Sequence, residues 1–343
     1  MIKLFKPFIS EESKTLCLEV LNSDQIAEGE MVKQFEYEFG NIFGKENVVA
    51  VNSGTSALEL AYELAGIKAG DEVISPVLTC TATNIPLVRR GAKIVFADIS
   101  KDLNINIEDV KQKLTSNTKA IVFIHFGGNN RGLKELLAIC RERKIILIED
   151  AAQAVGSEYW GVGDFTCISL QAIKTITSGD GGFLLCAEKE MYEKAKRLRW
   201  FGYDRGQKQK MGDTDLTEAG YKYHMNNISA AIGLGNLRAF DDIQSHITGL
   251  QMIYEKHGLF AHSWLAGGIT DRYEELKKLM SDNGIEIGQH HYDNRKYTLF
   301  KQFGGVCPVM DELTTKYFFV PYHMGVKLTD AEKIGKLWKN FNV

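Results

Sequence analysis

Two side chains differ in chemistry from their surroundings, the amine of Lys174 and the carboxylate of Asp150. Lys174 lies in the polar, glycine-rich run Ile168–Gly182, twenty-four positions after Asp150, which ends an apolar stretch. A lysine that loses its proton through burial or a neighbouring cation can attack an aldehyde. A carboxylate at the end of a buried strand is costly without a partner, and a protonated ring nitrogen is a suitable one. The two residues therefore predict an enzyme that holds pyridoxal phosphate (PLP) on Lys174 as an internal aldimine.

Both residues also have an ordinary structural interpretation. Lys174 could be a solvated turn lysine, and Asp150 could cap the next turn or meet an arginine at the surface. The hydroxyl groups and glycines around Lys174 favour a binding role, in which Ser169 could hydrogen-bond a phosphate oxygen. Glu149 would point to the opposite face of a strand from Asp150, so it is given no role.

A second candidate site is the run Ser53–Ser56, where a short apolar stretch meets a predicted helix. Free backbone N–H groups at a helix start, together with the hydroxyls of Thr55 and Ser56, could hold a phosphate. The alternative is an ordinary helix N-cap.

The histidines offer weaker candidates. His125 ends an apolar strand, whereas His290 and His291 are adjacent and would point to opposite faces of any strand. His291, with Tyr292 beside it, is a candidate for binding substrate, and the alternative is a structural histidine. No two histidines have the i, i+4 spacing of a zinc site, so no metal is expected.

Elements that would position these residues alternate between strand and helix from residue 46 onward. Near-continuous apolar strands between amphipathic helices indicate a parallel sheet covered on both faces, and ligands bind beyond the carboxyl ends of such strands. We therefore predict an N-terminal segment and large α/β domain at 1–235, and a smaller C-terminal α+β domain at 236–343. The predicted strands are 48–51, 72–77, 93–99, 120–126 and 144–148, and the predicted helices are 56–65, 81–90, 107–114 and 132–143.

Two further segments have distinct compositions. Residues 202–220 are polar and rich in glycine, which predicts a long loop. Residues 225–237 are helical in pattern and rich in small side chains, so this helix could pack closely against another one.

Overall composition excludes several classes of protein. The 343 residues are 44% hydrophobic and 25% charged, with a net charge of −3 and no basic block, which argues against nucleic-acid or anionic-membrane binding. No apolar run approaches the roughly 20 residues that span a bilayer. The six cysteines show no CxxC spacing, which favours reduced thiols and a cytoplasmic protein.

Taken together, the motifs occur in the order found in the sugar aminotransferases of the DegT/DnrJ/StrS type, and the chain resembles this family over nearly its whole length. Several motifs in one order are much more specific than any one alone. The segments that carry the resemblance are 29–36 (GEMVKQFE), 52–58 (NSGTSAL), 148–154 (IEDAAQA), 169–182 with Lys174, 220–225 (GYKYHM) and the pair Ala230–Ala231.

This resemblance implies the fold of fold-type I PLP enzymes and a role for each motif. Lys174 would form the internal aldimine, Asp150 would pair with the pyridine nitrogen, and Gln153 would contact the ring hydroxyl. The phosphate would be held by Thr55, Ser56 and Ser169.

The chain departs from the family pattern at two places. The family completes each site across a homodimer, where an asparagine near the 220–225 motif reaches the partner's phosphate. Here that donor could be His224 or Asn226, and the sequence does not choose between them. Cys80 stands where many members carry an aromatic residue stacked on the cofactor ring. A cysteine could cover the ring only with its sulfur.

The resemblance implies a cytoplasmic, homodimeric aminotransferase. It would convert a nucleotide-linked 4-keto-6-deoxy sugar to an amino sugar with glutamate as amino donor, for a surface polysaccharide such as a lipopolysaccharide O-antigen or a related glycan. Family members with a histidine in place of the lysine are dehydratases, so Lys174 favours amino transfer. The alternatives are a PLP-dependent sugar dehydratase or lyase, and a non-catalytic regulator with the same fold.

Overall fold

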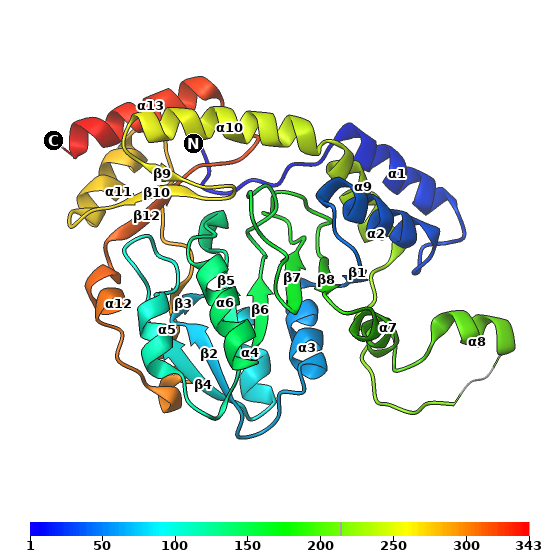
Figure 1. Ribbon diagram of the computed structural model, residues 1–343. Helices are drawn as coiled ribbons and strands as arrows, with labels where there is room; N and C mark the ends of the chain where they lie inside the picture. The colour runs from blue at the N-terminus through cyan, green and yellow to red at the C-terminus, as the bar shows by residue number, and fades with distance from the viewer. Residues whose placement is uncertain (213–214, 343) are drawn as a thin grey trace.

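The centre of the protein is a seven-stranded, mainly parallel sheet in the computed structural model, which describes residues 1–212 and 215–342 (Figure 1). Its strand order is β1-β8-β7-β6-β5-β2-β4, and β8 runs antiparallel to both of its neighbours. This architecture confirms the predicted fold class. The strands are β1 (Val48–Val51), β2 (Glu72–Pro76), β4 (Lys93–Ala97), β5 (Thr118–Ile124), β6 (Ile146–Asp150), β7 (Phe165–Ser169) and β8 (Gly182–Cys186).

Both faces of this sheet are covered, because alternate residues of a strand pack into different cores. In β5, Val122 and Ile124 belong to one buried cluster, and Ile121 and Phe123 belong to another. The helices that pack on the sheet include α2 (Glu30–Phe43), α3 (Gly54–Leu64), α4 (Thr81–Arg89), α5 (Ile107–Lys113), α6 (Leu133–Arg143) and α7 (Lys189–Leu198).

Every strand and helix predicted from the alternating pattern is present, with bounds that differ by at most two residues. The strand predicted at 144–148 begins only at Ile146, because Lys144 has the left-handed backbone (φ 55°) that ends α6. The loop predicted at 202–220 is partly wrong, since it contains the short helix α8 (Arg205–Met211). Residues 213–214 of that stretch lie outside the described part of the chain.

Close helix packing predicted for residues 225–237 is confirmed at α9 (Asn227–Arg238), which packs against α1 (Glu11–Asn22) and α2 (Glu30–Phe43). A Cβ added at Gly235 would lie 2.3 Å from the backbone nitrogen of Ser13. The small residues of α9 therefore let the backbones approach more closely than larger side chains would permit.

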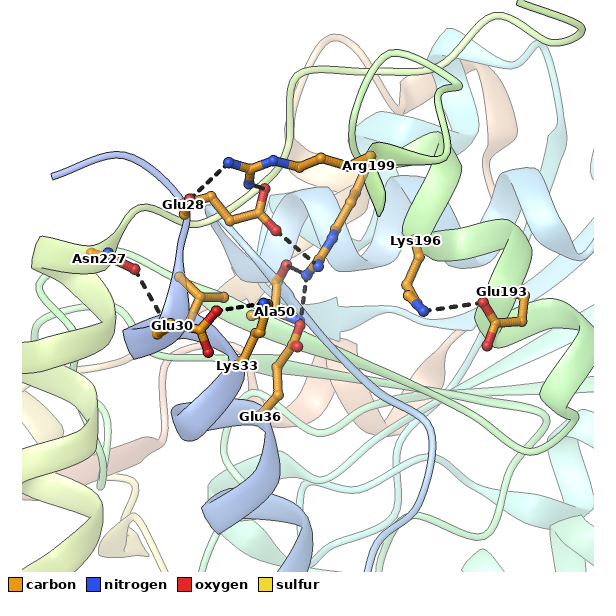
Figure 2. Close-up of polar contacts among 11 residues, drawn as sticks. Glu28, Glu30, Lys33, Glu36, Ala50, Glu193, Lys196, Arg199 and Asn227 are labelled. Carbon is orange, nitrogen blue, oxygen red and sulfur yellow. Dashed lines mark hydrogen bonds and ion pairs between the residues drawn. The ribbon is translucent and has the colours of Figure 1, made fainter. Parts of the chain in front are cut away.

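At Ala50, side chains close the outer edge of β1 (Figure 2), and His224 forms an isolated bridge with Val51 farther along the same edge. The Ala50 backbone N–H donates to Glu36 Oε1 at 2.7 Å, and Arg199 Nη1 donates to the Ala50 carbonyl at 2.6 Å. Arg199 also bonds to Glu36 and Glu28. Burial opposes the charge of Arg199, but these two carboxylates raise its pKa above the usual value. Glu36 and Arg199 thus occupy the backbone N–H and carbonyl of Ala50, which could otherwise pair with a strand of another molecule.

A C-terminal α+β unit lies at one end of the large sheet and carries a three-stranded antiparallel sheet in the order β12-β10-β9 (Figure 1). The predicted division at 235/236 falls within the last turn of α9 and stays a prediction. The unit contains α10 (Phe240–Lys256), β9 (Phe260–Ala261), β10 (Ala266–Ile269), α11 (Tyr273–Asp282), β12 (Tyr317–Val320) and α13 (Leu328–Phe341).

Short elements join this unit to the large sheet and its loops. The strands β3 (Leu78–Thr79) and β11 (Tyr292–Asp293) pair with each other across the two parts of the protein. The remaining short elements are η1 (Phe126–Gly128), η2 (Asn294–Lys296), η3 (Lys301–Phe303) and α12 (Pro308–Leu313).

Within the described ranges, no helix is long and apolar enough to cross a membrane. All six cysteines are free, as predicted, and Cys17 and Cys80 are the half-buried ones.

Candidate active site

Lys174 lies in the turn that connects the antiparallel strands β7 and β8. Its backbone N–H donates to the Gln171 carbonyl at 2.8 Å, and its amine lies 3.8 Å from the centroid of the Trp264 ring. The indole N–H of Trp264 donates to the carbonyl of Ile173, the residue before the lysine, at 3.0 Å. Burial lowers the pKa of the Lys174 amine to about 8, although the negative charge of Asp150 opposes the shift. A larger fraction of this amine is therefore neutral, and so nucleophilic, near neutral pH than for an ordinary lysine.

Asp150 ends β6 and is buried. Its Oδ2 accepts a hydrogen bond from Thr83 Oγ1 at 2.7 Å, and its Oδ1 accepts one from the Ala152 backbone N–H at 3.2 Å. Burial raises the pKa of this carboxyl, while these hydrogen bonds and the charge of Lys174 act in the opposite direction. The amine and the carboxylate thus lie close enough to affect each other's ionisation, as the chemistry predicted from the sequence requires.

The predicted phosphate-binding residues come together at the start of α3. Ser53 is the N-cap, and its Oγ accepts the Ser56 backbone N–H at 3.0 Å, so the N-cap interpretation holds as well. Thr55 lies half-buried in the first turn. A Cβ added at Gly54 would lie 2.8 Å from the Cβ of Ser169, which places the end of β7 directly against this turn. A helix N-terminus with four hydroxyl residues around it fits a phosphate group.

Gln153 is buried and held at both ends of its amide. Its Oε1 accepts the Gly127 backbone N–H at 2.6 Å, and its Nε2 lies 3.0 Å from Nε2 of His291. The charge of Lys174 also acts on both His290 and His291. Gln153 and His291, which the sequence proposed for different roles, are therefore neighbours beside Lys174.

The expectation that His290 and His291 point to opposite faces is wrong. Their ring centroids are 3.8 Å apart. The reason is the backbone of His291, which has a φ of 63° and so breaks the alternation of an extended strand. Tyr292 next to it is 45% exposed, and its backbone pairs with Thr79.

Cys80 lies in the same region, at the N-cap of α4, and is half-buried. Burial raises the pKa of its thiol, and the charges of Asp150 and Lys174 act on it. That its sulfur covers the cofactor ring, as the resemblance implies, stays a prediction.

His224 and Asn226 occupy different surroundings within this single chain. His224 forms a bridge with Val51, and its ring lies 6.0 Å from that of Trp200. Asn226 is exposed and caps α9, with its Oδ1 accepting the Ser229 backbone N–H at 2.9 Å. A contact from either residue to a partner's phosphate stays a prediction.

His125 and Glu149 form a buried pair, with His125 Nε2 2.7 Å from Glu149 Oε2. Glu149 also accepts backbone N–H groups from Gly161, Val162 and Gly163. This pair anchors the loop that follows Asp150, a structural role that the sequence pattern did not reveal.

Two residues of the site were missed by the sequence analysis, Trp264 and Thr83. Thr83 follows Thr79 by four residues, and their hydroxyls are 2.9 Å apart, so the spacing at a helix start was a usable signal. Nothing near Trp264 in the sequence indicates its contact with Lys174, because the contact depends on how the C-terminal unit folds back.

The functional groups of these residues match those of PLP. The Lys174 amine, whose pKa is lowered, matches the aldehyde of PLP. The buried carboxylate of Asp150 matches the ring nitrogen, and the hydroxyl-rich helix start at Gly54 matches the phosphate. The fold and the chemistry of these residues fit a PLP-dependent enzyme of fold type I.

Sequence comparison agrees with this class. The sequence profile described as "DegT/DnrJ/EryC1/StrS aminotransferase family" matches residues 7–337, so the chain belongs to this family of PLP-dependent enzymes. It is similar to the spore coat polysaccharide biosynthesis protein SpsC of Bacillus subtilis, with 35% identity over 337 residues that cover 93% of this chain and 83% of SpsC. It is also similar to the GDP-perosamine synthase of Vibrio cholerae, with 32% identity over 368 residues and 99% coverage of both chains.

Structural comparison gives the same class. The sugar aminotransferase CalS13 from Micromonospora echinospora superimposes with a TM-score of 0.93 at 27% identity, covering 99% of this chain and all of CalS13.

Proposed function

We propose that the protein aminates a nucleotide-linked keto-sugar, of the 4-keto-6-deoxy type, with glutamate as amino donor. The names of its relatives support a nucleotide-linked sugar, since one is a GDP-perosamine synthase and another takes part in polysaccharide biosynthesis. The product would be an amino sugar for a surface polysaccharide such as an O-antigen, made in the cytoplasm.

The observation that carries this proposal is the arrangement of Lys174, whose amine lies 3.8 Å from the centroid of the Trp264 ring, and of Asp150, whose carboxylate accepts a hydrogen bond from Thr83 at 2.7 Å. PLP supplies an electron sink when bound. With a pKa of about 8, the Lys174 amine can accept a proton at Nζ and return it near neutral pH. The Asp150 carboxylate, oriented by Thr83 and Ala152, would hold a proton on the cofactor's ring nitrogen.

The other residues would bind and orient the cofactor and the substrate. Ser56, Thr55 and Ser169 would hold the phosphate, and Gln153 would contact the ring hydroxyl. We further propose a homodimer in which His224 or Asn226 of each protomer completes the other protomer's site, and in which His291 and Tyr292 lie on the substrate side.

Two measurements test the function. Purified protein loaded with PLP should show a visible band near roughly 410–430 nm that glutamate bleaches and a keto-sugar restores. A panel of nucleotide-linked keto-sugars, incubated with glutamate, should give the ketone-to-amine mass change for at least one sugar. A band that glutamate leaves unchanged, with no amine formed from any sugar, would overturn the proposal in favour of a lyase or a regulator.

A further inference from the structure

The amide of Gln153 has a defined orientation in this structure. The Gly127 backbone N–H can only donate, so the Gln153 atom 2.6 Å from it must be the amide oxygen. The amide nitrogen is then the atom that lies 3.0 Å from Nε2 of His291. Because an amide nitrogen can only donate, His291 must accept this hydrogen bond.

His291 can accept only as a neutral imidazole with its proton on Nδ1. Its surroundings favour that form. Burial lowers its pKa well below the usual value, and the His290 ring, with its centroid 3.8 Å away, and the Lys174 amine act in the same direction. The hydrogen-bond geometry and the electrostatics therefore agree on one tautomer.

The main chain of His291 is fixed as well. Its φ of 63° lies in the left-handed region, which is costly for a histidine unless surrounding contacts hold it. Tyr317 provides such a contact, since its hydroxyl donates to the His291 carbonyl at 2.7 Å. The ring also meets Phe126 edge-on at 6.2 Å. The imidazole is thus held in one orientation against Gln153.

We infer that His291 is a positioning residue that acts through Gln153. By accepting one of the two amide N–H groups while Gly127 holds the oxygen, it fixes the direction of the second N–H. In residues 1–212 and 215–342, no other partner of that nitrogen occurs, so the second N–H is left for a bound group. The inference rests on the proposed function, in which this group is the ring hydroxyl of the cofactor.

Four single variants separate this role from simple packing. His291→Asn tolerates the left-handed backbone but has no acceptor at the position of Nε2. His291→Gln places an amide oxygen near that position and should rescue the contact. His290→Asn is the matched control, because the neighbouring imidazole has no hydrogen-bond partner for its buried Nε2 among the described residues. Gln153→Ala gives the full effect of losing the amide.

The readouts are the dissociation constant of PLP and the pH midpoint of the visible band of the loaded protein. We expect His291→Asn to weaken PLP binding about 3- to 10-fold, the effect of one neutral hydrogen bond. It should also shift the pH midpoint of the visible band in the same direction as Gln153→Ala does. The double variant His291→Asn/Gln153→Ala should shift this midpoint no more than Gln153→Ala alone. His291→Gln and His290→Asn should stay near wild type.

Wild-type values for His291→Asn, or equal effects of His290→Asn and His291→Asn, would overturn the inference. So would a Gln153→Ala variant with unchanged binding and spectrum, even if the wild-type enzyme aminates a keto-sugar. Failure of every keto-sugar in the panel, with the expected spectral shifts still present, would overturn the proposed function and leave this inference intact.

Discussion

The indole ring of Trp264 lies over the amine of Lys174, with 3.8 Å between Nζ and the ring centroid. The same indole donates its N–H to the carbonyl of Ile173. One side chain of the C-terminal unit therefore contacts both the backbone next to Lys174 and the Lys174 amine itself.

Trp264→Phe should impair the site without unfolding the protein. Phenylalanine keeps an aromatic face but loses the N–H that holds Ile173, so we expect PLP capture to slow by about 3- to 10-fold. Stopped-flow absorbance measures this rate. Trp338→Phe is the matched control, because the buried indole nitrogen of Trp338 has no partner among the described residues. Equal rates for the two variants would contradict the positioning role of Trp264.

The pH dependence of PLP capture should report the Lys174 pKa of about 8. Only the neutral amine attacks an aldehyde, so the capture rate should rise about tenfold per pH unit below the pKa and level off above it. A model lysine amine, measured in parallel, should continue to rise toward about pH 10.4. If the protein follows the model amine, burial does not lower the Lys174 pKa.

Lys174→Ala should abolish turnover and leave the fold intact. Without the amine there is no group at this position to accept and return a proton, and such groups contribute about 10²- to 10⁴-fold to the rate. The assay is multiple-turnover amination, with circular dichroism as the check on folding. Lys278→Ala, at an exposed lysine of α11, serves as control. Sustained turnover by the Lys174 variant would refute its role.

Asp150→Asn should lower the rate by about 10- to 100-fold while PLP remains bound, since a charged hydrogen bond is replaced by a neutral one. Thr83→Val should cause a smaller loss in the same direction, because it removes the hydroxyl that orients the carboxylate at 2.7 Å. Steady-state kinetics and cofactor absorbance measure both. Wild-type kinetics for Asp150→Asn would argue against pairing with the ring nitrogen.

Co-expression can test the proposed shared site. In a homodimer, a Lys174→Ala chain paired with a His224→Ala/Asn226→Ala chain would carry one intact site, so mixed dimers should be active although each variant alone is not. Differential affinity tags would isolate the mixed dimer. An inactive mixed dimer, in samples that sedimentation shows to be dimeric, would place His224 and Asn226 outside the partner's site.

Much of the site followed from the sequence because parallel strands bring their carboxyl ends to one edge. Asp150 and Ser53–Ser56 each lie where a strand was predicted to end, and the bounds of the predicted strands were nearly right. Strand β7, which ends in Ser169, was not among the predicted strands. Hydrophobic periodicity determines such elements locally, so they can be predicted from a single sequence.

Contacts that depend on tertiary folding could not be predicted in this way. Trp264 meets Lys174 across ninety positions of chain, through the docking of the C-terminal unit. His290 and His291 share a face because His291 has a left-handed backbone that its residue type does not require. The ion pairs of Arg199 with Glu28 and Glu36 likewise join distant segments.

Gly127 connects the two halves of the protein through both of its peptide groups. Its N–H donates to Gln153, in the turn that follows β6, and its carbonyl accepts the backbone N–H groups of Trp264 and Leu265 from the C-terminal unit. Its φ of 67° is left-handed, and an added Cβ would lie 3.1 Å from that of Leu265. Separating the halves at this point would break these bonds and release Gln153 and Trp264 together. The contacts that Gln153 and Trp264 make near Lys174 therefore both depend on the main chain of one residue.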